Sequence, residues 1–370
     1  MAREVPRLAA GVGSLSGRDS PIPGTVRFGL NRWNFSSPAS FALDVKRGEE
    51  LGWDLALIPS SPLLVPDPYV MLAFAARVTD RITLGPLIEN PVMRHPAVLA
   101  SSISTVDLIA SGRTLLGLGA GDTAVRLMAK HPAKVVELEE ATQLARELLT
   151  GNEVDIGTRE VARLLHARPV PVWVAAGGPR TLRMAGRVAD GVFIRVGRHE
   201  ANLRAAVTAV HEGAREVGRD TSEVEIGVVL HTLLTDDPAY AASVGRAIAT
   251  GFYEYSPTLF DGPGLGWDGP DIETLREQVW PDFHHTPDLE AAGELVSFLD
   301  DAAVKTFTLA GGTDELVAQL RELLELDLPI STVVLHRLPA QRGAKQRGNR
   351  DWKEIVAREV LEYVQPLTID

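Results

Sequence analysis

The stretch from residue 81 to residue 122, RITLGPLIENPVMRHPAVLASSISTVDLIASGRTLLGLGAGD, decides how this chain folds. Residues 82–87 and 114–118 are apolar and strand-like. Residues 95–109 carry apolar side chains at helical spacing, and Gly112 lies just past them as a stop signal. A strand, a helix and a second strand in roughly 40 residues form one βαβ unit of a parallel sheet. Both strands run into Gly- and Pro-rich loops, which in parallel α/β folds are where ligands bind.

The same alternation continues on both sides of this unit. Further strands are predicted at 26–31, 54–59, 172–176, 191–196, 224–234 and 332–335. Further helices are predicted at 38–51, 68–78, 134–149, 180–188, 203–217 and 313–324. Eight strands that alternate with helices predict an α/β fold of the (β/α)8 TIM-barrel type, and the alternative is an open, doubly wound parallel sheet.

Three segments lie outside this rhythm. We expect residues 1–23 to be a flexible tail, residues 24–340 to hold the barrel, and residues 341–370 to be a linker and a helix at 352–364. Within the barrel, residues 251–287 form an insertion rich in Gly, Pro and aromatic residues, and a loop of that length is usually functional or disordered. Its aromatic side chains predict a substrate lid or a dimer contact, or else an insertion that packs its own aromatics.

The composition narrows the class of protein. A net charge of −12 argues against a nucleic-acid partner, which would favour a basic face. The chain has no cysteine, which excludes disulfides, thiolate catalysis and Cys-ligated iron–sulfur clusters. No apolar run is long enough for a signal peptide or a membrane span, so we expect a cytoplasmic protein with no membrane partner.

Two glycine-rich loops are candidate ligand sites. Gly117, Gly119 and Gly121 follow a GxGxG spacing, so any likeness to the GxGxxG dinucleotide fingerprint is weak. These glycines either relieve crowding at a strand end or let a planar cofactor approach bare backbone. The loop 175–181, AAGGPRT, lies between a strand and a helix, where exposed N–H groups and Arg180 would suit a phosphate. An ordinary turn is the alternative there.

The histidines give weaker signals. His95 stands at a helix start, and we expect a structural role for it. His284 and His285 lie near Asp282 and suggest a metal site, but adjacent residues rarely supply two ligands of one ion. We therefore expect a loop there, and we predict no metal.

Three segments carry a family resemblance. They are GPLIENPVMRHPAVLASSISTVDLIASGRTLLGLGAGD at 85–122, PVPVWVAAGGPRTLRMAGRVADGVFI at 169–194 and TLAGGTDELVAQLREL at 308–323. They resemble the bacterial luciferase-like superfamily of flavin and deazaflavin enzymes, and within it the coenzyme F420-dependent reductases of the methylene-tetrahydromethanopterin reductase type. The likeness spans roughly residues 26–338 with gaps. It implies a TIM barrel, hydride transfer between C5 of coenzyme F420 and a small organic substrate, and a homodimer.

The resemblance also implies which residues hold the cofactor. In the family, the strand end at residues 85–91 carries a non-proline cis peptide that supports the ring system, and by position this bond is Leu87–Ile88. Contacts to the ring edge are implied for Leu87, Ile88, Gly119, Ala120, Gly121, Asp122 and Thr123. Contacts to the phosphate-bearing tail are implied for Ala175, Ala176, Gly177, Gly178, Pro179, Arg180 and Thr181.

The chain departs from the family pattern at three positions, which we expect to face the substrate. Glu89 stands where a threonine is common, and burial could raise its pKa enough for acid or base catalysis. Ser60 lies in the stretch where many relatives carry an Asp-His pair. Asn31 occupies the stretch where the reductases carry an acidic residue, and its amide cannot transfer a proton at neutral pH.

Other functions stay open at this point. The same resemblance includes monooxygenases that use FMN, although the missing Asp-His pair counts against that reading. Loss of the usual acid and base residues favours a cofactor-binding protein without turnover. A subunit that pairs with an active homologue is a further alternative.

Overall fold

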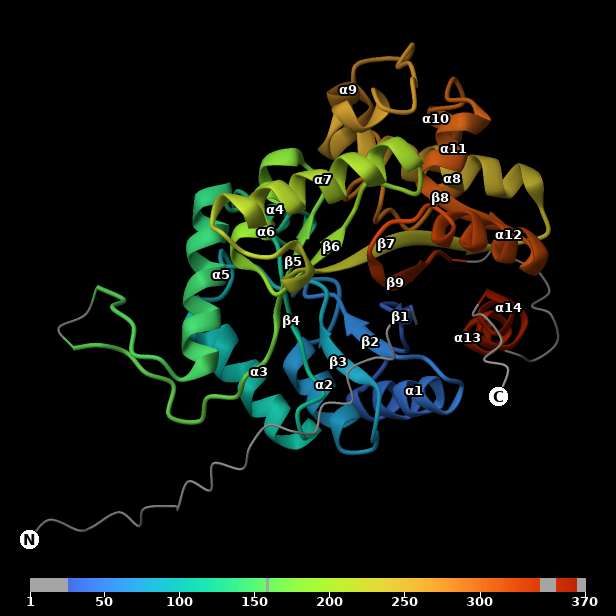
Figure 1. Cartoon of the computed structure of the whole chain (residues 1–370). Helices are drawn as coiled ribbons and strands as arrows, with labels where there is room; N and C mark the ends of the chain where they lie inside the picture. Colours follow the sequence, from blue (N-terminus) through green and yellow to red (C-terminus); the bar gives the residue numbers. More distant parts are fainter. Residues whose placement is uncertain (1–25, 158–159, 340–350, 365–370) are drawn as a thin grey trace, which may run out of the picture.

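Parallel strands with intervening helices form a barrel in this protein. The computed structural model describes residues 26–157, 160–339 and 351–364 (Figure 1). The barrel strands are β1 (Arg27–Leu30), β2 (Leu55–Ile58), β3 (Thr83–Pro86), β4 (Leu116–Leu118), β5 (Val172–Ala176), β6 (Gly191–Ile194), β7 (Glu225–Leu234) and β9 (Ile330–Arg337). They pair in parallel in the order β3-β2-β1-β9-β7-β6-β5-β4.

Two backbone bridges close the ring between β3 and β4. One joins Leu84 to Thr114, and the other joins Glu89 to Leu118. The predicted (β/α)8 barrel is therefore confirmed, and the open doubly wound sheet is wrong. All eight barrel strands lie where the sequence predicts them, to within two residues at each end.

Helices surround the barrel (Figure 1). They are α1 (Pro38–Glu50), α2 (Pro68–Ala76), α3 (Pro96–Ala110), α4 (Thr123–Arg126), α5 (Val135–Thr150), α6 (Pro179–Val188), α7 (Glu200–Glu216), α8 (Pro238–Tyr255) and α12 (Thr313–Leu324), with a 3-10 turn at Thr221–Glu223. Proline at the first turn and a capping side chain begin several of them. His95 caps α3, since its Nδ1 accepts a hydrogen bond from the Ala97 N–H at 3.2 Å. The structural role predicted for His95 is confirmed.

The segment between β7 and β9 differs from the sequence prediction. Helix α8 was not predicted, and it runs to Tyr255, so the irregular segment begins after 255 and not at 251. It contains η2 (Pro257–Phe260), α9 (Ile272–Arg276), α10 (Leu289–Leu295) and α11 (Asp301–Phe307). A further strand, β8 (Thr308–Gly311), was also missed, and it pairs with the second half of β7. We call residues 256–307 the insertion, and α9 and α10 stand at the top of the molecule in Figure 1.

The aromatic residues around the insertion pack against one another. Tyr253 stacks on Trp267 with ring centroids 4.0 Å apart, and Phe260 stacks on Phe307 at 5.2 Å. Only Trp280 among the aromatics of 251–287 is mostly exposed. These contacts agree with the alternative in which the insertion packs its own aromatics, and the lid and the dimer contact stay predictions.

The C-terminal helix predicted at 352–364 is present as α13 (Trp352–Val356), a π-helical turn (Ala357–Leu361) and α14 (Glu362–Val364). Trp352 stacks on Trp53 with centroids 6.2 Å apart, which fixes this helix to the barrel. The predicted tail at 1–23 and the predicted linker at 341–350 lie outside the described residues.

Side chains that point into the barrel form a separate apolar cluster. It contains Leu55, Leu57, Leu87, Leu115, Trp173, Phe193, Val229 and Val334, with Ile88 and Ala175 packed against it. Because side chains alternate between the two faces of a strand, the next inward positions of β6, β7 and β9 are Arg195, His231 and His336. The fold therefore carries these three residues to the carboxyl-end rim of the barrel.

Candidate functional site

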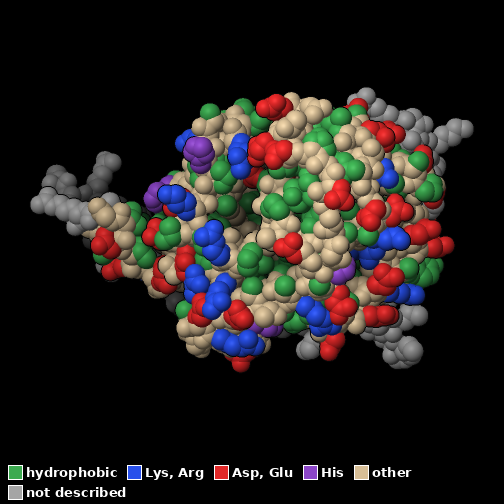
Figure 2. Space-filling model, turned by 90° about the horizontal axis from the view of Figure 1, so that it is seen from above, with side chains coloured by type: hydrophobic (Ala, Val, Ile, Leu, Met, Phe, Trp, Pro, Cys, Tyr) green, Lys and Arg blue, Asp and Glu red, His purple; other side chains and the backbone are tan. Residues whose placement is uncertain are grey.

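The rim at the carboxyl ends of the strands divides into two halves of different chemistry. We call the ends of β2, β3, β4 and β5 the glycine half, and the ends of β6, β7, β9 and β1 the basic half. The face of the molecule that carries α9 and α10 is hollowed near its centre (Figure 2). Ligands of parallel barrels bind at this end of the strands.

The glycine half is shaped by a bulge after β3. The Leu87–Ile88 bond is a non-proline cis peptide, as the resemblance implied. A Cβ on Gly119 would lie 2.1 Å from Cδ1 of Ile88, and a Cβ on Gly117 would lie 2.2 Å from the Pro86 oxygen. Gly117 is therefore required for β4 to lie against the bulge, whereas a Cβ on Gly119 would only have to displace the end of the Ile88 side chain. The crowding alternative is thus correct for Gly117, and cofactor contact at this loop stays a prediction.

The loop after β4 is held by the insertion. Gly121 has a φ of +77°, and Asp122 forms an ion pair with Arg126. Thr123 is buried, and its hydroxyl donates to Asp282 Oδ2 at 2.6 Å. Half-buried Ala120 accepts a hydrogen bond from the Ala133 N–H at 2.8 Å. The predicted cofactor residues 119–123 thus form one loop held by hydrogen bonds within the protein. The Thr123 hydroxyl in it is engaged by Asp282.

The loop after β5 has an open helix N-terminus. Gly178 is the N-cap of α6 and makes no side-chain cap, and Pro179 begins the helix. A Cβ on Gly178 would meet no atom within 4 Å, whereas a Cβ on Gly177 would lie 2.6 Å from the Arg195 oxygen. The first N–H groups of α6 have no partner within the helix, and such groups together with the helix dipole favour an anion. Ala175, Ala176, Arg180 and Thr181 flank this position.

Glu89 lies behind the glycine half, beyond the reach of solvent. Its side chain is fully buried, and Oε1 lies 3.9 Å from Nε of Arg94. Burial raises the pKa of Glu89 to about 7, and the charge of Arg94 and the Ser60 hydroxyl oppose this shift. Neither carboxylate oxygen accepts a hydrogen bond of regular geometry from a described residue, and the buried hydroxyl of Tyr69 is equally without a partner.

Asn31 follows β1, in the basic half of the rim. Asn31 Nδ2 lies 3.0 Å from Nδ1 of His336, and Nε of Arg32 donates to Nε2 of His336 at 3.2 Å. Arginine can only donate, so Nε2 must accept and the proton of the neutral ring resides on Nδ1. Nδ1–H of His336 then needs an acceptor, so the Asn31 amide is flipped. Its oxygen, not its nitrogen, faces Nδ1 and accepts this hydrogen bond. Of the three predicted catalytic residues, the structure brings together Glu89 and Ser60 only.

A cluster of three histidines completes the basic half, with His231 and His284 buried and His336 half-buried. The ring of His231 lies 4.8 Å from the ring of His284 and 4.7 Å from that of His336. Burial, followed by neighbouring positive charges, lowers the pKa of all three well below the usual value, so they are neutral. His284 Nε2 donates to the Ile248 carbonyl at 3.0 Å, while Nδ1 of His231 and of His284 have no partner among the described residues.

The sequence analysis missed these histidines, Arg32 and Arg195 as site residues. His231 and His336 follow inward positions of their strands, so the period-2 pattern could have placed them on the inner face. Their proximity depends on the pairing of β7 with β9, in which His231 lies opposite His336. That pairing requires the barrel closure, which a single strand pattern does not contain.

The insertion is fastened to the glycine half by Asp282. Its Oδ1 accepts from the backbone N–H groups of His284 and His285 at 2.9 Å and from Nδ1 of His285 at 2.7 Å. Although burial opposes it, His285 holds the pKa of Asp282 below its usual value. Among the described residues, no group of three or more His, Asp or Glu side chains is arranged to hold a metal ion.

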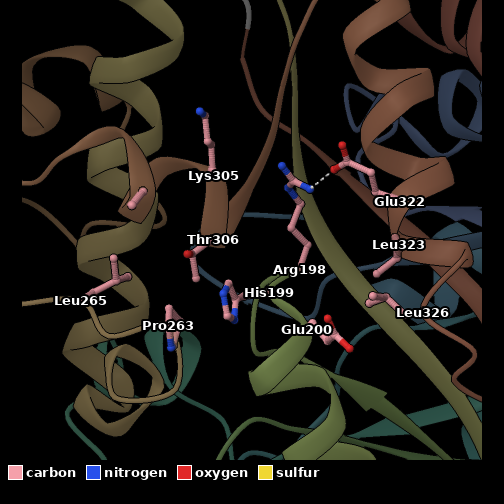
Figure 3. Close-up of a pocket in the computed structure, with 11 residues that line it drawn as sticks. Arg198, His199, Glu200, Pro263, Leu265, Lys305, Thr306, Glu322, Leu323 and Leu326 are labelled. Atoms are coloured by element: carbon pink, nitrogen blue, oxygen red, sulfur yellow. Dashed lines mark hydrogen bonds and ion pairs between the residues drawn. The ribbon is translucent and has the colours of Figure 1, made fainter.

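One cavity lies to the side of the rim, where α7 begins (Figure 3). Its volume is about 360 Å³, and it is lined by Arg198, His199, Glu200, Pro263, Leu265, Ala302, Lys305, Thr306, Glu322, Leu323 and Leu326. The guanidinium of Arg198 is paired with Glu322 at 3.2 Å. The cavity thus has its positive charge partly neutralised within the chain.

Among the helices of residues 26–157, 160–339 and 351–364, none is both long and apolar enough to cross a membrane.

Comparison with known proteins gives a consistent result. Residues 37–327 match the family described as luciferase-like monooxygenase. The 5,10-methylenetetrahydromethanopterin reductase of Methanopyrus kandleri is 27% identical over 332 residues, which cover 81% of this chain and 90% of that protein. The F420-dependent glucose-6-phosphate dehydrogenase of Nocardia farcinica is 33% identical over 186 residues, or 46% of this chain and 55% of that protein.

A solved structure shares the fold. The coenzyme F420-dependent tetrahydromethanopterin reductase from Methanopyrus kandleri superimposes with a TM-score of 0.72 at 24% sequence identity. The match covers 92% of this chain and 99% of that one.

Proposed function

The chain belongs to the luciferase-like monooxygenase family, and we propose that it is an oxidoreductase that uses coenzyme F420 to act on a small organic substrate. The observation that carries this proposal is the sequence similarity, over 81% of the chain, to the methylenetetrahydromethanopterin reductase of Methanopyrus kandleri. The solved tetrahydromethanopterin reductase of that organism, which shares the fold, is described as dependent on coenzyme F420. FMN is the second candidate cofactor, because the family is named for monooxygenases.

The glycine half fits a planar cofactor with a phosphate-bearing tail. Leu87, Ile88 and Gly119 present apolar side chains and bare backbone to the rim, and the open cap at Gly178 would receive the phosphate. The loop at 119–123 would border the ring edge. When bound, F420 would supply the redox chemistry, which is hydride transfer at C5 of the deazaflavin.

The remaining predicted residues would orient the substrate. Asn31 stands at the rim with its amide fixed by His336, so it can hold a polar substrate group in one direction. Ser60 lies at the end of β2 and interacts with the buried Glu89. Because Glu89 is fully buried, we propose that it acts through Ser60 and the bulge as a positioning residue.

We also propose a homodimer, which would form through α2 and α3. These helices contact each other and expose the apolar side chains of Val70, Phe74, Val98, Leu108 and Ile109. Exposed apolar groups gathered on one face commonly mark a protein interface. Sedimentation of the native protein and of Phe74→Glu tests this: a dimer that dissociates in the variant supports it, and a native monomer contradicts it.

Cofactor titration tests the proposed function. Purified protein is titrated separately with F420 and with FMN in matched buffers, with tryptophan fluorescence as the readout. Trp173 belongs to the barrel-interior cluster together with Leu87 and Ile88, so binding at the rim should quench it. Tight binding of F420 alone supports the proposal, preference for FMN supports the monooxygenase alternative, and binding of neither contradicts both.

A further inference from the structure

The basic half holds two arginines that lack a carboxylate partner. Arg32 follows β1 and Arg195 follows β6. Among the described residues, no acid lies within ion-pair distance of either guanidinium. The nearby acid Asp122 is paired with Arg126; burial raises its pKa, and the charges of Arg126 and, to a smaller extent, Arg195 oppose this shift.

The surroundings of these arginines do not compensate their charge. Burial lowers the pKa of Arg32, and within the described part of the chain its side chain donates one hydrogen bond, to neutral His336. Arg32 and Arg195 act electrostatically on the same two imidazoles. After burial, the positive charge of each arginine contributes to the lowered pKa of His231 and of His336. The basic half is therefore two cations flanking neutral rings, one of which, His231, is buried and has an unpartnered nitrogen. A guanidinium that is partly withdrawn from water without an acidic partner, as in Arg32, is costly, so this arrangement favours an anion from outside the chain.

We propose that Arg32 and Arg195 bind an oxyanion of the substrate, a carboxylate or a phosphate group, with His336 and His231 between them. The planar guanidinium presents parallel N–H donors that match both groups. This inference rests on the proposed function, because it assigns the cofactor to the glycine half and the substrate to the basic half. It places the substrates among organic acids or phosphate esters.

The register of the strands makes this a single site. His336 lies opposite His231, and Leu335 lies opposite Leu30, so Asn31 and Arg32 follow at the level of His336. On the other side, Val228 lies opposite Ile194, so Arg195 is level with Val229, two residues before His231. The unpartnered Nδ1 of His231 and the Asn31 amide nitrogen would then orient the rest of the substrate.

Anion protection tests the proposal. The thermal midpoint is measured against inorganic phosphate and, separately, succinate at constant ionic strength, in free protein and in protein saturated with F420. The variants are Arg32→Gln, Arg195→Gln and Arg32→Lys, and the control is Arg358→Gln, an exposed helical arginine paired with Glu362.

The proposal predicts that at least one anion raises the midpoint of the F420-saturated native protein. Its apparent Kd should increase at least tenfold in Arg32→Gln and Arg195→Gln, less in Arg32→Lys, and not in Arg358→Gln. A response to phosphate alone indicates a phosphate ester, and a response to succinate alone indicates a carboxylate. Equal protection of all variants, no protection, or protection abolished by F420 would overturn the proposal. If F420 does not bind, the proposed function fails, and the titration of the free protein still tests the anion site.

Discussion

The two halves of the rim differ in the side chains that line them. In the glycine half, a Cβ has no room at Gly117 and would displace the Ile88 side chain at Gly119, and the surface is backbone and apolar side chain. In the basic half, the corresponding inward positions hold Asn31, His336 and His231, beside Arg32 and Arg195. A flat apolar surface suits a ring system, and a set of fixed polar groups suits recognition of a substrate. The difference shows how one barrel end can separate cofactor from substrate.

The buried ionisable groups follow the same division. Behind the glycine half, burial raises the pKa of the Glu89 carboxyl to about 7. In the basic half, burial lowers the pKa of three imidazoles. Burial disfavours the charged form in both cases. It favours the protonated, neutral carboxyl of Glu89 and the deprotonated, neutral imidazoles of the three histidines. The two arginines, which cannot deprotonate, are left as the fixed charges of the rim.

The largest effect is expected for cofactor binding on replacement of Gly178. Gly178→Trp should fill the open N-terminus of α6 and weaken F420 binding by about 1,000-fold, or roughly 4 kcal/mol. The thermal midpoint should be unchanged, because a Cβ there meets no atom within 4 Å. Gly178→Ala adds only a Cβ, which leaves the N–H groups open, and it should retain binding. If Gly178→Trp and the native protein bound F420 with equal affinity, the cofactor phosphate would not bind at this loop.

The next effect concerns the fastening of the insertion. Asp282→Ala removes the acceptor for Thr123, His285 and two backbone N–H groups, all of which are at least partly buried. The free energy of unfolding should fall by about 3–5 kcal/mol. Urea unfolding measures this loss. Asp282→Asn keeps one oxygen and should lose less, so equal losses in the two variants would show that the charge alone matters.

A smaller effect is expected from the pH dependence of Glu89. Its pKa is about 7 in the folded chain and near 4.5 when unfolded. The folded state binds more protons between these values, so the free energy of unfolding falls as the pH rises through this window. Glu89→Gln should remove the part of the slope that Glu89 contributes and be more stable than the native protein above pH 7, by on the order of 2–3 kcal/mol.

Urea unfolding at about pH 5 and about pH 8 measures this slope. Glu254→Gln is the matched control, because burial also raises the pKa of Glu254 to about 7, but on α8 and beside Arg276. It should reduce the slope without changing affinity for F420. An unaltered slope in Glu89→Gln would show that this carboxyl titrates normally in the folded protein.

The smallest effect is expected at Arg198, which follows the same strand as Arg195 but has a partner. Arg198→Gln breaks a pair with Glu322, whose side chain is 67% exposed. Such pairs contribute less than about 1 kcal/mol. The unfolding free energy should therefore change by no more than that, with little remaining at high salt. A larger loss would show that Arg198 supports the cavity beside α7.

The sequence predicted the barrel because most strands are short apolar runs and most helices are periodic and capped. It also located the cis bond at Leu87–Ile88 by family likeness. Helix α8 and strand β8 were missed, since they lie in a stretch where the regular spacing fails. His231 and His336 were missed because their neighbourhood is created by the pairing of β7 with β9. The burial of Glu89 likewise follows from the bulge, which moves it off the rim.

The division of the rim is tested most directly by a crystal structure of the protein with F420 bound. The account predicts the deazaflavin ring against Leu87, Ile88 and Gly119, and the phosphate at the N-terminus of α6 near Gly178. Arg32 and Arg195 should remain free of the cofactor and open to the substrate. A ring placed against His231 and His336, or a cofactor phosphate bound by Arg32, would contradict the account.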